Sequence, residues 1–297
     1  MAEYCVTGGT GFIAAYLVKA LLSKGFKVRA TVRDPEDEGK VGFLWSLEGA
    51  RERLRLVKAD LTVEGSFDEA VDGVDGVFHT ASPVFLTYDQ NVQETLINPA
   101  IKGTKNVLDS CSRSSSVRRV VLTSSCSSIR YRDDATLISP LNESHWSDTE
   151  YCKRYNLWYA YSKILAEQEA WRLAKEYNID LVVVNPSFVV GPYPNLTIGF
   201  VHIDDVVRAH ILAMEDRRAS GRLICSGSVA HWSEIVEMIK AKYPVYPIPT
   251  KCGDQKGDSN PHSMDTTKIR NLGFPPFISI PQMFDECIKS FQDKGLL

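Results

Sequence analysis

The chain has 297 residues, 44% of them hydrophobic and 24% charged, with a formal net charge of −3. A chain of this length can bury a substantial core as one large domain or two smaller ones. The small net charge gives no reason to expect nucleic acid or an acidic membrane as a partner. No apolar run approaches the ~20 residues that a membrane span needs.

Cysteine usage points to a reducing compartment. The seven cysteines are scattered, odd in number and form no CxxC pair, which argues against a disulfide framework and against a zinc site. A periodic segment begins at about residue 3, which leaves no room for a targeting peptide. We therefore expect a cytoplasmic protein, either a monomer or a homodimer.

The first thirty residues predict a βαβ unit. In chain order they comprise a short buried strand (YCV), a glycine turn (TGGTG), a helix that ends at Gly25 (FIAAYLVKALLSK) and a second strand (KVRATVR). Two strands joined through a helix in this way predict a parallel sheet.

The glycine turn predicts a nucleotide site. Gly8 and Gly11 have no Cβ atoms, so the backbone can turn sharply and lie close to a pyrophosphate, which the N–H groups at the helix start would hold. The spacing is Gly8-x-x-Gly11-x-x-Ala14, not GxGxxG. An ordinary tight turn is the alternative, but the position between a strand and a helix favours a dinucleotide.

The end of the second strand indicates which dinucleotide is bound. Enzymes that prefer NAD carry an acidic residue there for the ribose 2′-OH. This chain has Arg33, with Lys40 seven residues on, and a cation suits a 2′-phosphate. NADPH is therefore expected over NADH, although Asp34 is compatible with either. The alternative is that both basic residues are solvated in a surface loop.

Four later runs predict further strands of the same sheet, at 54–62, 73–83, 117–128 and 178–192. Each ends in polar or small residues, and helical segments lie between them. In open α/β sheets the ligand binds at the carboxyl ends of the strands. The pattern predicts an α/β fold with a doubly wound parallel Rossmann sheet, and Asp60 is placed to bond an adenine amino group.

Tyr159 and Lys163 predict the chemistry of the site. Residues i and i+4 of a helix share a face. An ammonium about 4 Å from a phenol favours the phenolate by roughly 4 kcal/mol at an effective dielectric of ~20, so the pKa of the tyrosine would fall. Such a phenol can give a proton to a carbonyl oxygen as hydride reaches the carbon, with Ser124 or Ser125 as a second donor. The alternative is a core tyrosine, a solvated lysine and a serine-rich turn.

These motifs together resemble the extended short-chain dehydrogenase/reductases. The runs ATVRDP, ADLTVEGSFDEAVDGVDGVFHTASP, NESHWSD, KILAEQEAW, NPSFVVGP and FVHIDDVVRAHILAME are similar to the plant dihydroflavonol reductase and cinnamoyl-CoA reductase group, over essentially the whole chain. The resemblance implies a catalytic set of Ser125, Tyr159 and Lys163. It implies NADP binding by Gly8, Thr10, Gly11, Phe12, Ile13, Arg33, Lys40, Asp60, Leu61, Thr80, Ala81, Ser82, Tyr159, Lys163, Pro186 and Val189.

Within that group, the runs VGFLW, LTSSCSSIRYR, SPLNESHWSD, EYCKRYNLWY and CSGSVAHWSEI most resemble tetraketide α-pyrone reductases, which act on the route to the sporopollenin of pollen walls. Arg130 stands where dihydroflavonol reductases have an asparagine, and it could pair with a pyrone enolate. Reduction of cinnamaldehyde or cinnamoyl-CoA is the main alternative, although YNLWYAYSK differs from the KNWYCYGK run of cinnamoyl-CoA reductases.

The chain beyond residue 185 predicts a smaller lobe. We expect an NADP-binding domain at 1–185 and a substrate lobe at 186–297, from which the chain could cross back. Relatives have a longer segment between VVGP and FVHIDDV than the YPNLTIG found here at 193–199. His202, Asp204, Asp205 and His210 suggest a metal cluster, but a structural role is the better interpretation: Asp204 or Asp205 caps the following helix and His210 lies on its surface.

Two other functions fit parts of the pattern. A sugar-nucleotide epimerase of the same superfamily would keep NAD bound, and Arg33 argues against it. A non-catalytic nucleotide sensor typically lacks the tyrosine or the lysine, and this chain has both. The sequence thus predicts an NADPH-dependent carbonyl reductase acting on a small hydrophobic metabolite, without a metal.

Overall fold

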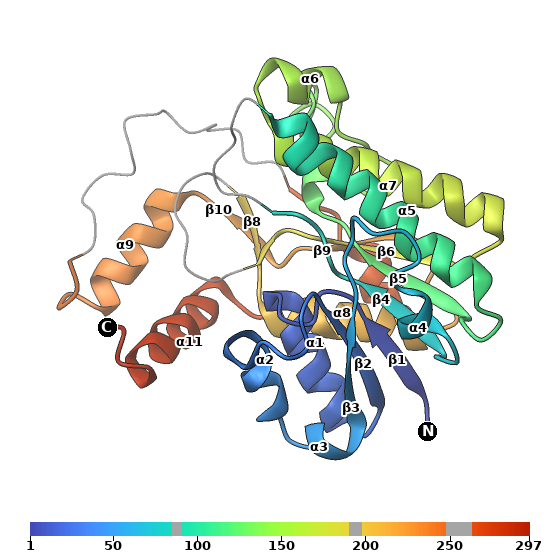
Figure 1. The fold of residues 1–297 in the computed structure, drawn as a ribbon. Helices are drawn as coiled ribbons and strands as arrows, with labels where there is room; N and C mark the ends of the chain where they lie inside the picture. The colour runs from blue at the N-terminus through green and yellow to red at the C-terminus, as the bar shows by residue number, and fades with distance from the viewer. Residues whose placement is uncertain (85–90, 190–197, 248–262) are drawn as a thin grey trace.

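The computed structural model describes residues 1–84, 91–189, 198–247 and 263–297 (Figure 1). The short segment at 193–199 and the proline-rich loop at 242–263 lie largely outside these ranges. The described chain forms a seven-stranded parallel sheet with helices on both faces, and a three-stranded sheet beside it. The predicted α/β fold with a doubly wound parallel sheet is confirmed.

The larger sheet has the strand order β3-β2-β1-β4-β5-β6-β9. Every strand is parallel to its neighbours, as the βαβ pattern predicts. Its strands are β1 (Glu3–Val6), β2 (Lys27–Val32), β3 (Leu54–Lys58), β4 (Gly76–His79), β5 (Arg119–Thr123), β6 (Leu181–Pro186) and β9 (Gly221–Cys225). Valine-rich strands such as β6, in which every residue is buried, suit a sheet covered on both faces.

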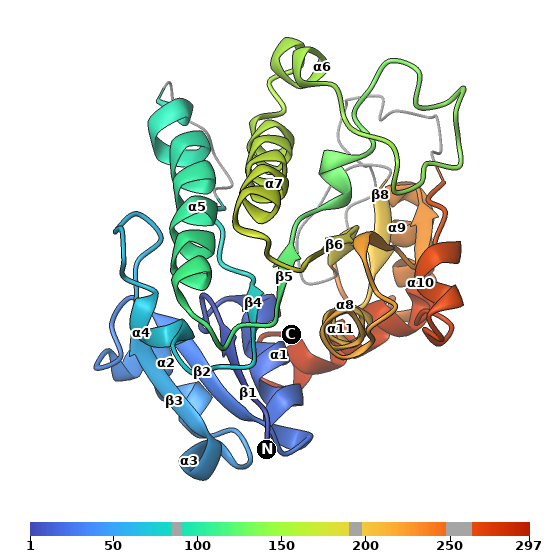
Figure 2. The same cartoon turned by 90° about the vertical axis from the view of Figure 1, so that its right-hand side faces the viewer.

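Helices cover the two faces of this sheet, as Figures 1 and 2 show. One face carries α4 (Asp68–Val71), α5 (Asn98–Arg113) and α7 (Trp158–Tyr177). The other carries α1 (Phe12–Ser23) and α8 (Ile203–Glu215). The short helices α2 (Glu38–Trp45) and α3 (Ala50–Arg53) connect β2 to β3. A π-helical turn η1 (Gln93–Ile97) runs into α5, and a 3-10 turn η2 (Cys126–Ser128) follows β5.

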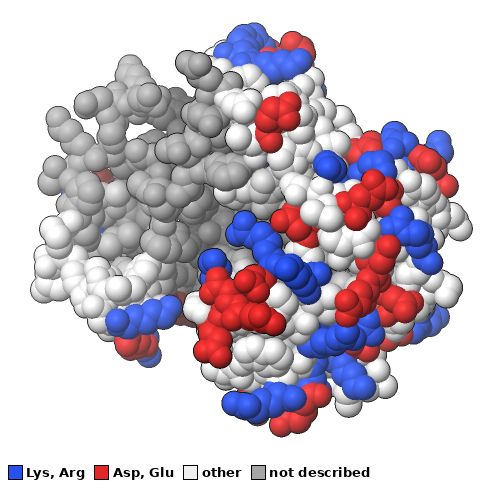
Figure 3. All heavy atoms as spheres, in the orientation of Figure 1, with Lys and Arg blue, Asp and Glu red and all other residues white. Residues whose placement is uncertain are grey.

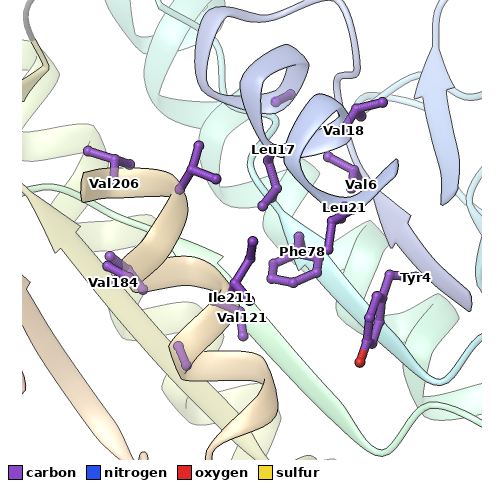
Figure 4. Close-up of a cluster of buried hydrophobic side chains, with 14 of the residues drawn as sticks. Tyr4, Val6, Leu17, Val18, Leu21, Phe78, Val121, Val184, Val206 and Ile211 are labelled. Carbon is purple, nitrogen blue, oxygen red and sulfur yellow. The ribbon is translucent and has the colours of Figure 1, made fainter. Parts of the chain in front are cut away.

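Regularly spaced apolar residues of α1 form part of the core beneath α1 and α8. Leu17, Val18 and Leu21 of α1 project toward the sheet, where they meet Phe78 of β4 and Ile211 of α8 (Figure 4). The spacing of these α1 residues places them on one helix face. This cluster packs α1 against the sheet beside α8.

The small sheet and the helices beside it pack around aromatic side chains. This sheet joins β10 (Ser228–Ala230), β8 (Ile198–Val201) and β7 (Phe188–Val189). The remaining helices are α6 (Thr149–Arg154), α9 (Trp232–Lys242), α10 (Thr267–Asn271) and α11 (Ile280–Asp293). Phe200 of β8 lies edge-on to Trp232 of α9 and Phe284 of α11, at centroid distances of 5.4 and 5.9 Å. These contacts hold α9 and α11 against the small sheet.

Charged side chains of both signs are interspersed over the described part of the face drawn in Figure 3. No single sign of charge dominates there. This distribution fits the small net charge of the chain and offers no extended basic surface of the kind that binds nucleic acid.

Candidate active site

The turn after β1 brings the backbone close to two neighbouring strands. Gly8 has φ of +70°, and a Cβ built on it would lie 3.0 Å from the Cβ of Ala81. A Cβ on Gly9 would lie 2.8 Å from the Cβ of Ala30. Both positions therefore exclude a side chain. Sequence reasoning identified Gly8 but missed Gly9, although the glycine doublet was the available signal.

The start of α1 has the features of an anion site. Gly11 is the cap residue and supplies no side-chain hydrogen bond to the helix. Because the first N–H groups of an α-helix have no partner within the helix, those at Phe12 and Ile13 remain available to a ligand. Thr10 and Phe12 are exposed, so this helix end is accessible. The residues present thus fit a pyrophosphate.

The two predicted 2′-phosphate ligands differ in their surroundings. Arg33 directly follows β2 and is exposed. Lys40 lies on α2, and its Nζ is 2.7 Å from Oδ2 of Asp37. The hydrogen bond from Lys40 lowers the pKa of the Asp37 carboxyl. Arg33 is therefore better placed than Lys40 to meet a phosphate without giving up an existing ion pair.

Asp60 and Leu61 form the loop after β3. Oδ1 of Asp60 accepts hydrogen bonds from N and Oγ1 of Thr62, at 2.8 and 2.6 Å. These bonds, with Arg33 as a minor contributor, lower the pKa of Asp60 and favour its carboxylate. Asn106 of α5 donates to the carbonyl of Leu61 at 2.7 Å. The loop is therefore held in place.

The loop after β4 is tied to the end of β1. Thr80 donates its hydroxyl proton to the carbonyl of Thr7, and the N–H of Ala81 donates to Oγ1 of Thr7 at 3.0 Å. The buried ring of His79 bonds the same hydroxyl at 3.0 Å, and burial lowers the pKa of His79 to about 3. A neutral histidine thus joins the two strand ends, and Thr80 to Ser82 lie next to the glycine turn.

Helix α7 carries Tyr159 and Lys163 on one face. Nζ of Lys163 lies 5.8 Å from the centroid of the Tyr159 ring and 3.5 Å from the carbonyl oxygen of Thr123, to which it donates. Lys163 is buried, whereas Tyr159 is half-buried. Burial lowers the pKa of Lys163 to about 8. The predicted pair therefore exists as a buried cation beneath a partly accessible phenol.

The structure distinguishes between the two serines after β5. The Ser124 hydroxyl is buried and donates to Oε2 of Glu167 at 2.5 Å. Ser125 is half-buried, and its Oγ accepts a hydrogen bond from the N–H of Ser127 at 3.0 Å. The hydroxyl proton of Ser125 is not used by that bond. Ser125, but not Ser124, therefore fits a donor to a substrate.

Three further predicted residues lie near the ends of β5 and β6. Pro186 is the last residue of β6 and is buried, while Val189 of β7 is half-buried. The guanidinium of Arg130 lies over the ring of Tyr131, with its central carbon 4.3 Å from the centroid. Arg130 is five residues beyond Ser125 in the sequence and comes shortly after turn η2.

The sequence predicts that Asp204 or Asp205 caps α8 and that His210 lies on the helix surface, and the structure corrects both points. His202, not an aspartate, caps α8, because its Nδ1 accepts from the N–H of Asp204. His210 is fully buried, not on the surface: Nε2 bonds Oγ1 of Thr123 and Nδ1 bonds the carbonyl of Val206, both at 2.7 Å. Burial lowers its pKa to about 4.

The described residues lack two features, a metal-binding cluster and a membrane-spanning helix. They contain no group of three or more His, Cys, Asp and Glu side chains arranged to hold a metal ion. None of the helices described is long and apolar enough to cross a membrane.

The candidate residues converge because their strands are parallel. The glycine turn, the loop at 80–82 and Ser125 follow β1, β4 and β5, and Pro186 ends β6; these four strands are adjacent in the sheet. Their carboxyl ends share one edge, and α7 brings Tyr159 and Lys163 to β5 through the contact with Thr123. The arrangement can hold a dinucleotide beside a phenol and a hydroxyl.

Known proteins are similar to this chain in sequence and in fold. Residues 4–199 match the model of the NAD dependent epimerase/dehydratase family. Tetraketide alpha-pyrone reductase 2 of Arabidopsis thaliana is 64% identical, with both chains covered completely. Cinnamoyl-CoA reductase CAD2 of Medicago truncatula is 42% identical, with 98% of this chain and 95% of that protein covered. The resemblance to this reductase group is thereby confirmed.

A solved structure agrees with the fold. The yeast methylglyoxal/isovaleraldehyde reductase Gre2, solved in complex with NADPH, superposes with a TM-score of 0.84 at 25% identity. The superposition covers 99% of this chain and all of the other. The similarity therefore extends over essentially the whole chain.

Proposed function

The chain belongs to the NAD dependent epimerase/dehydratase family, and we propose that it uses NADPH to reduce a carbonyl group on a hydrophobic plant metabolite, a tetraketide α-pyrone. One observation carries the proposal: Lys163, which lies beside the Tyr159 ring, contacts the carbonyl of Thr123 two residues before Ser125, at the sheet edge that also presents the glycine turn. The names of the relatives at 64% and 42% identity support reduction of a carbonyl substrate.

The cofactor is NADPH. The uncapped start of α1 and the side-chain-free turn at Gly8 and Gly9 fit its pyrophosphate, and Arg33 supplies a cation for the 2′-phosphate. We assign Asp60 and Leu61 to the adenine, Thr80 to Ser82 to the ribose, and Pro186 and Val189 to the nicotinamide. When bound, NADPH supplies the hydride that reduces the carbonyl carbon. The NADPH in the yeast reductase complex supports this assignment.

Tyr159, Lys163 and Ser125 carry out the proton transfer to the substrate. Tyr159 donates its phenolic proton to the carbonyl oxygen as the carbon accepts hydride, so that the carbonyl becomes an alcohol and the phenolate regains a proton from solvent. The Lys163 ammonium, 5.8 Å from the ring centroid, favours that phenolate through its opposite charge. Ser125 donates a second hydrogen bond to the same oxygen and holds it in place.

Arg130 is proposed to recognise the substrate. A pyrone can ionise to an enolate, and a guanidinium beyond the Ser125 turn would pair with it. Replacing Arg130 by alanine is expected to raise the Michaelis constant for a pyrone about tenfold or more and to leave NADPH binding unchanged. An Arg172→Ala variant is the control, because Arg172 is exposed and pairs with Glu169 and Glu176. An unchanged Michaelis constant in Arg130→Ala would remove Arg130 from the substrate site.

The wider setting is also part of the proposal. Six cysteines in the described residues are free, which supports a reducing, cytoplasmic location. The substrate would bind between the domain at 1–185 and the lobe at 186–297, and the enzyme would act as a monomer or homodimer.

The test is NADPH oxidation measured against four substrates: a tetraketide α-pyrone, coniferaldehyde, feruloyl-CoA and dihydroquercetin. The highest kcat/KM is expected with the pyrone. A higher value with coniferaldehyde or feruloyl-CoA would favour the second candidate, a phenylpropanoid reductase, which the 42% identity to a cinnamoyl-CoA reductase supports. If the protein oxidises NADPH with none of the four substrates, both candidate functions are refuted.

A further inference from the structure

A buried ion pair lies one helical turn beyond Lys163. Glu167 of α7 and Arg222 of β9 are 1% and 6% exposed, and Nε of Arg222 lies 2.7 Å from Oε1 of Glu167. The ring of Trp146 covers the guanidinium at 4.0 Å. Burying two charges costs several kcal/mol per ion, and well-packed apolar residues are often at least as stabilising. Stability alone therefore does not explain this pair.

The Glu167 carboxylate joins three elements at the carboxyl edge of the sheet. Its Oε2 accepts hydrogen bonds from Oγ of Ser124 at 2.5 Å, Oγ of Ser128 at 2.7 Å and Nδ2 of Asn185 at 3.1 Å. These residues follow β5, end turn η2 and lie on β6, respectively. A single carboxylate on α7 thus fixes the backbone around the serine turn.

Ser125 is held from both sides by this network. Ser124 precedes it directly, and the N–H of Ser128 donates to the Ser125 carbonyl at 3.0 Å. Asn185 donates to that carbonyl at 3.2 Å while it also donates to Glu167. The position of the Ser125 hydroxyl therefore depends on groups that Glu167 holds.

Glu167 also acts on Lys163 through its charge. Tyr159, Lys163 and Glu167 are spaced at i, i+4 and i+8, so they lie along one helix face. Burial disfavours the Lys163 ammonium, and the Glu167 carboxylate partly offsets this by raising the pKa of Lys163. Tyr159 of α7 and His79 of β4 also face Lys163, and burial keeps His79 neutral. Arg222 of β9 faces Glu167 from the other side.

We propose that Glu167, held by Arg222, is a positioning residue for carbonyl reduction: it locks the Ser125 turn to the helix that carries Tyr159 and keeps Lys163 protonated. The inference rests on the proposed function and extends it to a residue that touches neither substrate nor cofactor. Two effects follow from one carboxylate, and they can be separated because one depends on its charge and the other on its reach.

The test compares Glu167→Gln and Glu167→Asp with the wild type by steady-state kinetics across pH. Glu167→Gln is expected to lower kcat about 10- to 100-fold, to leave the Michaelis constants within about threefold, and to move the alkaline limb of the kcat profile to lower pH. Glu167→Asp keeps the charge but shortens the reach, so kcat falls while the limb stays near its wild-type position. Glu176→Gln, on the exposed part of the same helix, is the control and should change nothing.

A purely structural role predicts a different result. The double variant Glu167→Gln/Arg222→Met removes both charges, and it is expected to recover the thermal stability that Glu167→Gln loses by leaving Arg222 unpaired. Under our proposal kcat stays low and the limb stays shifted in this double variant. Recovery of kcat together with stability would overturn the proposal.

A readout without catalysis separates this inference from the proposed function. The ionisation of Lys163 can be followed by NMR of labelled lysine side chains, with Lys163→Met identifying the signal. The wild-type midpoint should lie at about 8 and should be lower in Glu167→Gln. An equal midpoint in both proteins would overturn the inference. If the wild type reduces no carbonyl substrate, the proposed function is refuted. The titration then still decides whether Glu167 raises the pKa of Lys163.

Discussion

Replacing Lys163 by methionine is expected to stabilise the cofactor-free protein while it abolishes activity. Lys163 is 7% exposed, and its Nζ contacts one carbonyl oxygen at 3.5 Å. This long contact and the Tyr159 ring, whose centroid is 5.8 Å from Nζ, do not replace the hydration that the ammonium loses. Methionine has a similar length and no charge, so it can fill the same space without that cost.

The magnitude follows from the pKa of Lys163, which burial lowers from 10.5 to about 8. Because each pH unit corresponds to ~1.4 kcal/mol, keeping the ammonium buried at pH 7 costs the folded state about 3 kcal/mol. Below pH 8 both states hold the proton and the full cost applies. Between pH 8 and 10.5 only the unfolded state holds it, so wild-type stability rises with pH through this window relative to Lys163→Met.

Urea denaturation of both proteins at pH 7 and pH 10, without NADPH, measures this difference. At pH 7, Lys163→Met should be more stable by up to about 3 kcal/mol, and at pH 10 most of the gap should have closed. Lys175→Met, an exposed position on the same helix, is the control and should match the wild type at both values. A less stable Lys163→Met at pH 7, with a gap that does not vary with pH, would refute the reasoning.

Three further predictions concern the cofactor, the glycine turn and the serines. Arg33→Gln should weaken NADPH binding about 10- to 100-fold, the loss of a charge-assisted hydrogen bond, and leave NADH binding unchanged in a fluorescence titration; equal losses would contradict this. Gly9→Ala should lower the melting temperature and weaken NADPH binding, because its Cβ would lie 2.8 Å from that of Ala30; an unchanged melting temperature would count against it. Ser125→Ala should lower kcat without loss of stability, whereas Ser124→Ala should mainly lower stability by removing a donor to a buried carboxylate. A loss of kcat in Ser124→Ala and of stability in Ser125→Ala would contradict this assignment of the two serines.

Local patterns sufficed to predict most of the larger sheet. Buried parallel strands are nearly continuous apolar runs, which is how residues 181–184 signal β6, and the glycine turn between a strand and a helix signals β1 and α1. The seventh strand, β9, gave no such signal. Arg222 interrupts its apolar run, and partners distant in sequence, Glu167 and Ser128 among them, make that arginine compatible with burial.

The same limit applies to the site. Tyr159 and Lys163 share a helix, so their spacing predicts their proximity. The choice between Ser124 and Ser125 depends on a carboxylate 43 residues away from Ser124, and no local pattern shows it. The sequence predicts His210 on the surface of its helix, but its bond to Thr123 across 87 residues places it in the core.

The most direct test of the mechanism is the kcat/KM of Tyr159→Phe for the carbonyl substrate, measured by NADPH oxidation, together with its affinity for NADPH. Loss of the proton donor predicts a fall of about 10²- to 10⁴-fold in kcat/KM with NADPH affinity unchanged. A Tyr159→Phe variant that retains activity within a few-fold of the wild type would contradict the assignment of the proton to this phenol.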